Sequence, residues 1–400
     1  MIPDGWQVQN LEDVALIILG QSPPSSACND KVKGYPFYQG NAEFGYRHPL
    51  PQRWIEKPLK VAKKDDILIS VRAPVGELNI ANVDCCIGRG IGAIRPLSVN
   101  KNFIYYTLLN ARNSLASVSQ GSTFDAINGK ELRSLSLLIP PLPEQKKIAA
   151  ILSSVDDAIQ ATQAVINQTR RVKQGLLQQL LTRGIGHTRF KQTEIGEIPE
   201  EWDVHQIGNL FKQVRKPVSV EKESHYQEIG IRSHGKGIFH KDKITGEKLG
   251  NKRVFWIEPN CLILNIVFAW ERAVAVTNNQ EKGMIASHRF PMFKPDGRRI
   301  QLSFIILYFH SLKGMHALGS ISPGGAGRNK TLSQKAFLKL PIPVPPLVEQ
   351  TRIAEAISKI DIALDKEQQK LESLNRTKRG LMQDLLTGRV RLKLDGEVAI

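Results

Sequence analysis

The sequence predicts an α+β protein in which two mixed α/β domains are separated by a long antiparallel two-helix coiled coil, with a pseudo-twofold internal repeat. Three observations lead to this prediction: a segment of 47 residues that occurs twice, a start motif that occurs twice, and heptad spacing within the repeated segment. Four hundred residues are enough for two or three domains with sizeable cores.

The repeated segment lies at residues 139–185 and again at 344–390. The two copies align without a gap at an offset of 205, with 19 identities in 47 positions. A shorter repeat precedes each copy, since "IPDGWQV" from Ile2 matches "IPEEWDV" from Ile198. Each half of the chain is therefore a tryptophan-marked start, a diverged block and the shared segment, which is the pattern of an internal duplication.

Apolar residues in both copies of the shared segment follow alternating steps of four and three residues, which is the seam of a coiled coil. The seam residues are Ile148, Leu152, Val155, Ile159, Ile166, Leu176 and Leu180 in the first copy, and Ile353, Ile357, Ile360, Leu364, Leu371, Leu374, Leu381 and Leu385 in the second. Two polar interruptions coincide between the copies: Thr162 with Glu367, and Lys173 with Lys378. Such interruptions cost stability but help to fix alignment and partner number.

The ends of both helices are marked in the sequence. Pro143 and Glu144 suit a first helical turn, and Gly184 and Gly388 suit termination. We expect two helices of about 40 residues, each about 60 Å long. Two matched seams favour pairing of the helices with each other, in opposite directions if the halves are related by a twofold axis; the alternative is that each helix packs only on its own domain.

The resulting division is a first domain (1–142), a spacer helix with its linker (143–195), a second domain (196–346) and a distal helix with a C-terminal tail (347–400). Short apolar runs at 65–70 and 260–267 predict strands, and 103–110 and 302–310 predict buried helices. We expect no membrane span, no disulfide and no metal site, because the four cysteines form no CxxC pair and no apolar run is long enough to cross a membrane. A cytoplasmic protein is expected.

The net charge of +17 predicts a polyanionic partner, because lysine and arginine that neutralise phosphates release condensed counterions. The first diverged block carries a net charge of +3 and the second +9. Basic residues cluster in the glycine-punctuated segment 232–253, which reads as a loop: either simply solvated, or supplying side chains to phosphates and base edges. The candidate DNA-binding residues are Arg232, Lys236, Asn251, Arg253, Arg328, Asn329 and Lys330.

The stretch "GGAGRNKT" (324–331) comes within one substitution of a phosphate-binding loop, with Asn329 in place of the last glycine. It aligns at the 205 offset with "SQGSTFDA", which has no lysine, and no apolar strand precedes it. We therefore expect no nucleotide site there. "GRGIG" (88–92) also fails, because its glycine spacing is wrong and no helix start follows. No catalytic motif of a methyltransferase, hydrolase or helicase is found, so no catalytic residue is assigned.

The motifs "PPLPEQKKIAAILSSVDDAI", "PPLVEQTRIAEAISKIDIAL", "TEIGEIPEEW" and "GYPFYQGNAEFG" resemble those of the specificity subunit of type I restriction–modification systems. The resemblance covers nearly the whole chain. It implies that the diverged blocks are target recognition domains, and that the paired helices are a spacer that also docks methyltransferase subunits.

The resemblance further implies a bipartite target on double-stranded DNA, one half read by each domain across a fixed gap. Methylation and cleavage would belong to methyltransferase and restriction/translocase subunits, which use S-adenosylmethionine, ATP and Mg²⁺, and the chain itself would need no cofactor. Two unlike domains predict an asymmetric target, and a repeated helix segment predicts a partner present twice. The alternatives are a non-catalytic protein-interaction scaffold and a stand-alone DNA-binding regulator.

Overall fold

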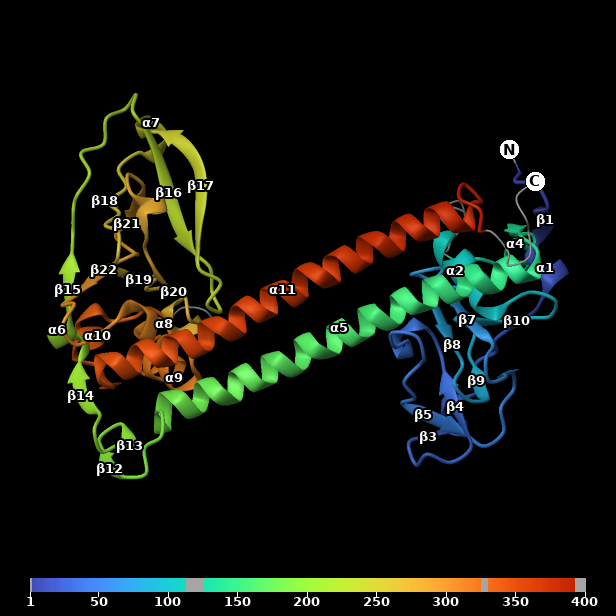
Figure 1. Cartoon of the computed structure of the whole chain (residues 1–400), viewed down its shortest axis with the longest axis horizontal. Helices are drawn as coiled ribbons and strands as arrows, with labels where there is room; N and C mark the ends of the chain where they lie inside the picture. Colours follow the sequence, from blue (N-terminus) through green and yellow to red (C-terminus); the bar gives the residue numbers. More distant parts are fainter. Residues whose placement is uncertain (1, 113–125, 325–329, 393–400) are drawn as a thin grey trace. The chain divides into compact units, whose positions relative to one another are not determined.

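The computed structural model describes residues 2–112, 126–324 and 330–392, and the chain forms two compact units. The first unit contains residues 1–164 and 368–400, and the second contains 165–367. Each unit therefore holds one diverged domain together with part of each long helix, α5 (Leu142–Arg183) and α11 (Leu347–Leu386) (Figure 1).

The first unit is a mixed α/β domain built from short strands. A four-stranded sheet has the order β2-β10-β7-β8, a five-stranded sheet has the order β3-β5-β4-β9-β6, and β1 pairs with β11. Its elements are β1 (Gln7–Asn10), α1 (Leu11–Val14), β2 (Ala15–Leu19), η1 (Ser25–Ala27), β3 (Cys28–Asn29), β4 (Tyr35–Tyr38), η2 (Asn41–Glu43), β5 (Arg53–Ile55), β6 (Val61–Ala62), β7 (Ile67–Ser70), β8 (Leu78–Ile80), β9 (Cys85–Ile87), β10 (Ile91–Pro96), α2 (Lys101–Asn110), α4 (Gly129–Arg133) and β11 (Ser136–Ile139).

The second unit repeats this topology. The sheet β15-β22-β19-β20 corresponds to β2-β10-β7-β8, the sheet β17-β16-β21-β18 corresponds to β5-β4-β9-β6, and β14 pairs with β23 as β1 pairs with β11. Its elements are β12 (Phe190–Thr193), β13 (Gly196–Pro199), β14 (Asp203–Gln206), α6 (Ile207–Leu210), β15 (Phe211–Val214), β16 (His225–Ile231), β17 (Ile238–Thr245), α7 (Gly246–Leu249), β18 (Val254–Trp256), β19 (Leu262–Leu264), η3 (Ala269–Glu271), β20 (Val274–Val276), η4 (Asn279–Glu281), β21 (Ile285–Ser287), β22 (Met292–Pro295), α8 (Leu302–His310), α9 (Leu312–Ser320), α10 (Gln334–Lys339) and β23 (Pro341–Val344).

The predicted strands and helices of the domains lie where the apolar runs placed them, as β7, β19, α2 and α8. The segment 232–253 was wrongly expected to be a loop, because it contains β17 and α7. β17 lies at the edge of its sheet, and its middle four residues are all exposed. An exposed, charged edge strand has no apolar alternation, so the sequence carries no strand signal there.

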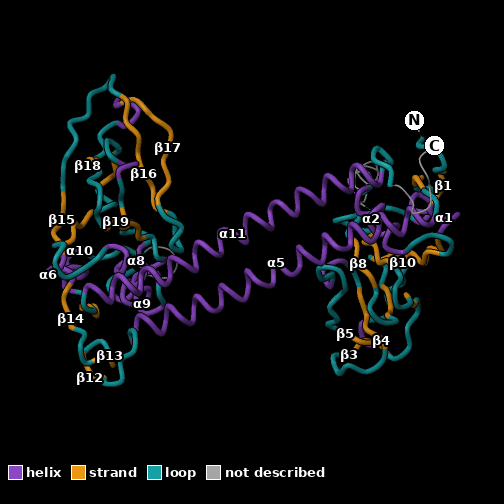
Figure 2. The backbone as a smooth tube through the Cα atoms, in the orientation of Figure 1, coloured by secondary structure: helices purple, strands orange, loops and turns teal. Residues whose placement is uncertain are grey.

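The long helices run antiparallel within each unit (Figure 2). In the first unit, Ile148 and Leu152 near the start of α5 share a core with Leu385 near the end of α11. In the second unit, Leu180 near the end of α5 shares a core with Ile353 near the start of α11. Both cores also include strand and helix residues of the adjoining domain, so each helix packs on its domain as well as on the other helix. The cores exclude apolar surface from water, which is the main favourable term in folding.

All fifteen seam residues are buried or half-buried. Buried are Ile148, Leu152, Ile159, Ile166, Leu180, Ile353, Ile357, Leu371 and Leu385, and half-buried are Val155, Leu176, Ile360, Leu364, Leu374 and Leu381.

The coincident lysines of the seam form reciprocal ion pairs. Lys378 lies 2.6 Å from Asp156 in the first unit, and Lys173 pairs with Asp361 in the second. Both partners are also related by the offset of 205, so the two copies exchange the same contact, as residues do across a twofold interface. A shift of the helices by one turn would separate both pairs. The seam lysines therefore favour this one antiparallel register.

The repeated "EQ" at the start of each helix joins the helix to its domain. Glu144 accepts a hydrogen bond from the indole of Trp6 (3.0 Å), and Glu349 accepts one from Trp202 (2.9 Å). The next residue, Gln145, accepts from the backbone N–H of the residue that caps α2 (2.7 Å). Gln350 does the same for α8 (2.8 Å). The repeated tryptophan and the repeated "EQ" are thus two halves of one junction.

The carboxyl group of Glu144 is also held by Arg391, with Nε–Oε1 and Nη2–Oε2 distances of 2.9 and 3.0 Å. Burial alone would raise the pKa of this carboxyl. The hydrogen bonds from Arg391 and Trp6 outweigh burial and hold its pKa below the ordinary value of 4.5. In the second unit the corresponding Glu349 is contacted by His187 (3.0 Å) rather than by an arginine.

Candidate nucleic-acid interface

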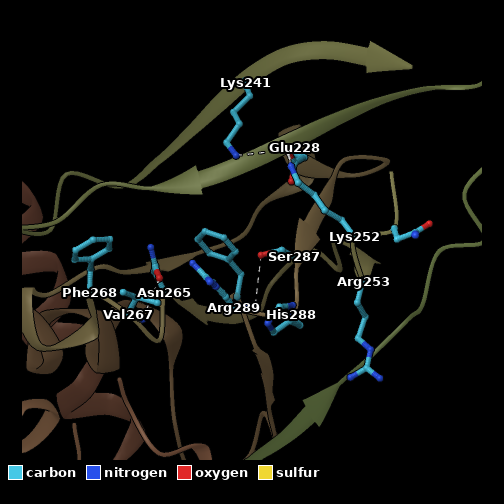
Figure 3. A pocket seen from close by; sticks show the side chains of 12 residues that line it. Glu228, Lys241, Lys252, Arg253, Asn265, Val267, Phe268, Ser287, His288 and Arg289 are labelled. Atoms are coloured by element: carbon cyan, nitrogen blue, oxygen red, sulfur yellow. Dashed lines mark hydrogen bonds and ion pairs between the residues drawn. The ribbon is translucent and has the colours of Figure 1, made fainter. Parts of the chain in front are cut away.

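A cavity of about 690 Å³ lies in the second domain, where residues from both of its four-stranded sheets meet (Figure 3). Residues of β16 and β17, the segment before β18, and the connections after β19 and β21 line it. The lining residues are Glu228, Lys241, Asn251, Lys252, Arg253, Asn265, Val267, Phe268, Ser287, His288, Arg289 and Phe290. β16 and β21 pair in parallel, so residues about 60 positions apart in the sequence come to the same place.

The lining carries an excess of positive charge. Glu228 is buried, and its carboxylate is shared by Lys252 (3.2 Å) and Lys241 (3.5 Å), which point toward it from different segments (Figure 3). Arg253 and Arg289 are exposed, and neither has an acidic partner among the residues that the structure describes. One carboxylate between two lysines, with two further arginines, leaves a site that attracts anions.

The remaining lining residues include amide and aromatic side chains. Asn251 and Asn265 carry amide groups that both donate and accept hydrogen bonds, as the edges of bases require. Phe268 and Phe290 are half-buried and supply apolar surface. Arginine and asparagine together match the side chains that most often read guanine and adenine edges in the major groove.

The structure brings together only part of the predicted DNA-binding set. Asn251 and Arg253 line the cavity. Arg232 instead lies with its guanidinium 4.8 Å from the ring of Phe239, and Lys236 is exposed in the turn between β16 and β17.

Lys330 belongs to the stretch 324–331, and its ammonium group lies 5.0 Å from the ring of Trp270. Arg328 and Asn329 lie outside the described residues.

Sequence reasoning missed Lys241, Lys252, Asn265, His288 and Arg289 as members of the same site. The two lysines lie inside the basic segment that the sequence had singled out. His288 and Arg289 directly follow the short strand β21, and polar or cationic residues at the end of an apolar run were the available signal. Their proximity to Asn251 depends on strand pairing, which the sequence does not reveal.

Residues 2–112, 126–324 and 330–392 contain no cluster of three or more histidine, cysteine or acidic side chains that could hold a metal ion. Within the same ranges, none of the helices combines the length and the apolar character that crossing a bilayer needs.

The duplicated architecture and the cationic, amide-bearing cavity fit one class of protein: a nucleic-acid-binding chain with two domains of matching topology and diverged sequence. A family model for the type I restriction modification DNA specificity domain matches the chain twice, over residues 3–170 and 199–376. The chain therefore belongs to the type I restriction–modification DNA specificity family. Specificity subunits are the non-catalytic components of type I restriction–modification systems, and this chain is a specificity subunit.

Two relatives from Methanocaldococcus jannaschii illustrate the likeness. The putative type I restriction enzyme MjaX specificity subunit is 43% identical over 185 residues, which span 45% of this chain and 44% of that subunit. The type I restriction enzyme MjaVIII specificity subunit is 23% identical over 419 residues, which span 98% of this chain and 94% of the relative.

A solved structure resembles the fold over nearly the full length. The type I restriction–modification system S subunit from M. genitalium has a TM-score of 0.56 at 16% identity, over 96% of each chain. The fold is therefore shared with that subunit despite the low sequence identity.

Proposed function

We propose that the chain reads a bipartite, asymmetric target on double-stranded DNA, with one half-site bound by each diverged domain. The observation that carries this proposal is that the two domains repeat one strand topology while their sequences have diverged. Duplicated domains that kept their fold and changed their surface are suited to reading two different sequences. The cavity of the second domain supports DNA as the ligand, because its cations suit phosphates and its amides suit base edges.

The repeated segment is proposed to dock two copies of a methyltransferase subunit, one on each half of the chain. A surface that occurs twice in a single chain suits a partner that is present twice. Restriction/translocase subunits would join the same complex. S-adenosylmethionine, ATP and Mg²⁺ would be bound by those partners, and this chain would bind none of them. A complex that acts on the DNA of the cell is expected in the cytoplasm.

The paired helices are further proposed to set the gap between the half-sites. Each helix has about 40 residues, and helix length translates into distance at 1.5 Å per residue. The gap would then be fixed in length and unread in sequence, in the way that dimer geometry fixes half-site spacing in other DNA-binding proteins.

Co-expression of the chain with its methyltransferase subunit, followed by sequencing of methylated DNA at single-base resolution, tests the proposal. The expected result is one target with two unlike half-sites separated by a constant number of unspecified bases. A target in one part, or a palindromic target, would contradict it.

The two alternatives predict different behaviour. A pure interaction scaffold predicts that the assembled complex binds DNA with little dependence on salt, whereas contact with phosphates predicts a steep fall in affinity as salt rises. A stand-alone regulator predicts site-specific DNA binding by the purified chain with no methyltransferase bound to it.

A further inference from the structure

Three strand connections of the first domain meet at one place. They are the residues after β2 (Gly20–Ser22), those after β4 (Gln39–Gly40) and the connection between β9 and β10 (Gly88–Gly90). Backbone hydrogen bonds tie two of them to neighbouring strands, from Gly20 N–H to the Ile91 carbonyl of β10 (2.9 Å) and from Gly88 N–H to the Tyr38 carbonyl of β4 (2.8 Å).

The glycines in these connections are required because the backbones of the connections approach one another closely. A Cβ atom on Gly20 would lie 2.1 Å from the carbonyl oxygen of Gly88, and one on Gly90 would lie 2.5 Å from that of Gln39. Any side chain at either position would force the connections apart. The "GRG" that fails as a nucleotide motif therefore has another role: its glycines allow three connections to pack tightly around the residue between them.

That residue is Arg89, and it is exposed. Its backbone N–H donates to the hydroxyl of Ser22 (3.0 Å), and Ser22 is in turn hydrogen-bonded to the side-chain amide of Gln39 (2.9 Å). No carboxylate pairs with the Arg89 guanidinium within the described part of the chain. Arg89 thus combines a fixed backbone with a free guanidinium, and two uncharged hydrogen-bonding side chains lie beside it.

The second domain has basic side chains in the corresponding connection, between β21 and β22. In the first domain, the N–H of Val71, just after β7, donates to the carbonyl of Gly90 (3.0 Å). In the second domain, the N–H of Ile266, just after β19, donates to the carbonyl of Arg289 (3.0 Å). By this register Arg89 corresponds to His288, which precedes Arg289. Both His288 and Arg289 line the cationic cavity. The two domains therefore present exposed basic side chains in the same connection of the same topology, Arg89 in the first and His288 with Arg289 in the second.

We infer that Arg89 reads a guanine in the half-site of the first domain, an inference that rests on the proposed function. Arginine forms two parallel hydrogen bonds to O6 and N7 of guanine, and this is the commonest specific contact in the major groove. A base reader must be held in position, and the glycine-packed connections with the Ser22 hydrogen bond hold the Arg89 backbone. A contact to phosphate alone would need the charge but not this fixed geometry.

The test uses the complete complex with its methyltransferase and a set of DNA duplexes that differ at one position of the target at a time. Replacement of Arg89 by alanine should lower the preference for G·C at a single position of one half-site, by roughly 5- to 150-fold, and leave the other half-site unchanged. Arg89→Lys should keep most of the affinity but lose the same preference, because lysine has the charge without the planar fork.

Lys63→Ala is the matched control. Lys63 is an exposed cation of the same domain whose ammonium group is already paired with Asp84 (2.8 Å). The Lys63→Ala variant should leave base preference unchanged at every position of the target.

Three outcomes would overturn parts of this reasoning. If Arg89→Ala weakens all duplexes equally and makes binding less salt-dependent, Arg89 contacts phosphate and the base-reading role is wrong. If Arg89→Ala leaves a wild-type bipartite target unchanged, Arg89 does not contact DNA. If the wild-type complex has no bipartite target, the proposed function itself fails.

Discussion

Replacement of the two seam lysines by methionine should cost very different amounts of stability, although the lysines occupy equivalent positions. Methionine keeps most of the apolar stem of lysine, so the change mainly removes the charge. In the first unit, Lys378→Met leaves the carboxylate of Asp156 without its cation. Asp156 is only 2% exposed.

Removal of one partner of a buried ion pair costs about 3 to 5 kcal/mol, because the remaining charge stays buried. Asp156 keeps hydrogen bonds from the hydroxyls of Tyr106 (2.8 Å) and Tyr46 (3.3 Å). We therefore expect the loss for Lys378→Met to fall near the lower end, at about 3 kcal/mol.

In the second unit, Lys173→Met should cost no more than about 1 kcal/mol, as for other solvent-exposed pairs. The side chains of Lys173 and its partner Asp361 are 29% and 45% exposed, so water can solvate the carboxylate that remains. The two substitutions remove the same group from equivalent positions of the repeat, and the burial of the remaining carboxylate is the main difference between them.

Urea denaturation followed by far-ultraviolet circular dichroism measures the loss, and hydrogen–deuterium exchange identifies the unit that loses protection. The double variant Lys378→Met with Asp156→Asn should recover part of the stability, because the unpaired charge is then gone as well. Equal losses for the two lysines, or a double variant no more stable than Lys378→Met alone, would refute the argument from burial.

Two further predictions concern the junction and the spacer. Because the pKa of Glu144 is lowered on folding, its contribution to stability is fully present above its ordinary pKa of 4.5 and is lost as the pH falls through the lower folded value. Glu144→Gln should therefore be less stable than wild type near neutral pH, and the difference should shrink in acid; denaturation curves at a series of pH values measure this, and a constant difference would contradict it. Insertion of seven residues at equivalent points of both helices should lengthen the gap between half-sites by about 10 Å, or about three base pairs, and leave the half-sites themselves unchanged; an unchanged gap in the methylated target would exclude the spacer as the determinant.

The sequence predicted the long helices well because their pattern is local and repeated. Heptad spacing persists over the shared segment, and both helices begin and end within a few residues of the predicted positions. The lysine interruptions were visible as well. Their partners were not, because Asp156 and Asp361 lie next to the seam and not on it, and only the pairing of the helices brings each to a lysine.

The common topology of the two domains could not be predicted from their sequences. Most of their strands have only two to five residues, too few for a period-2 pattern to stand out. The strands β9 and β21 occupy corresponding places, yet one reads "CCI" and the other "IAS". The two strands are equivalent because β9 pairs in parallel with β4 and β21 pairs in parallel with β16, and this pairing appears only in the folded chain.

The sequence could group only those residues of the candidate site that lie close together along the chain. Asn251 and Arg253 were grouped in this way, because both lie in one basic segment. His288 and Arg289 line the same cavity because of strand pairing. Arg89 could not be singled out from the sequence, because its position depends on the packing of three connections. Glu144 shows the same limit at the helix start: its charge fits the first turn, but the carboxylate accepts a hydrogen bond from an indole 138 residues earlier in the chain.

The proposed function requires that two unlike domains read DNA from equivalent places in a twofold-repeated chain. Replacing residues 2–139 by residues 198–344 would give both halves the same domain, and the DNA methylated by the resulting complex can then be sequenced. The expected target is palindromic: the half-site of the second domain occurs twice, in inverted orientation, and the other half-site is lost. Methylation of the original asymmetric target by this variant would contradict it.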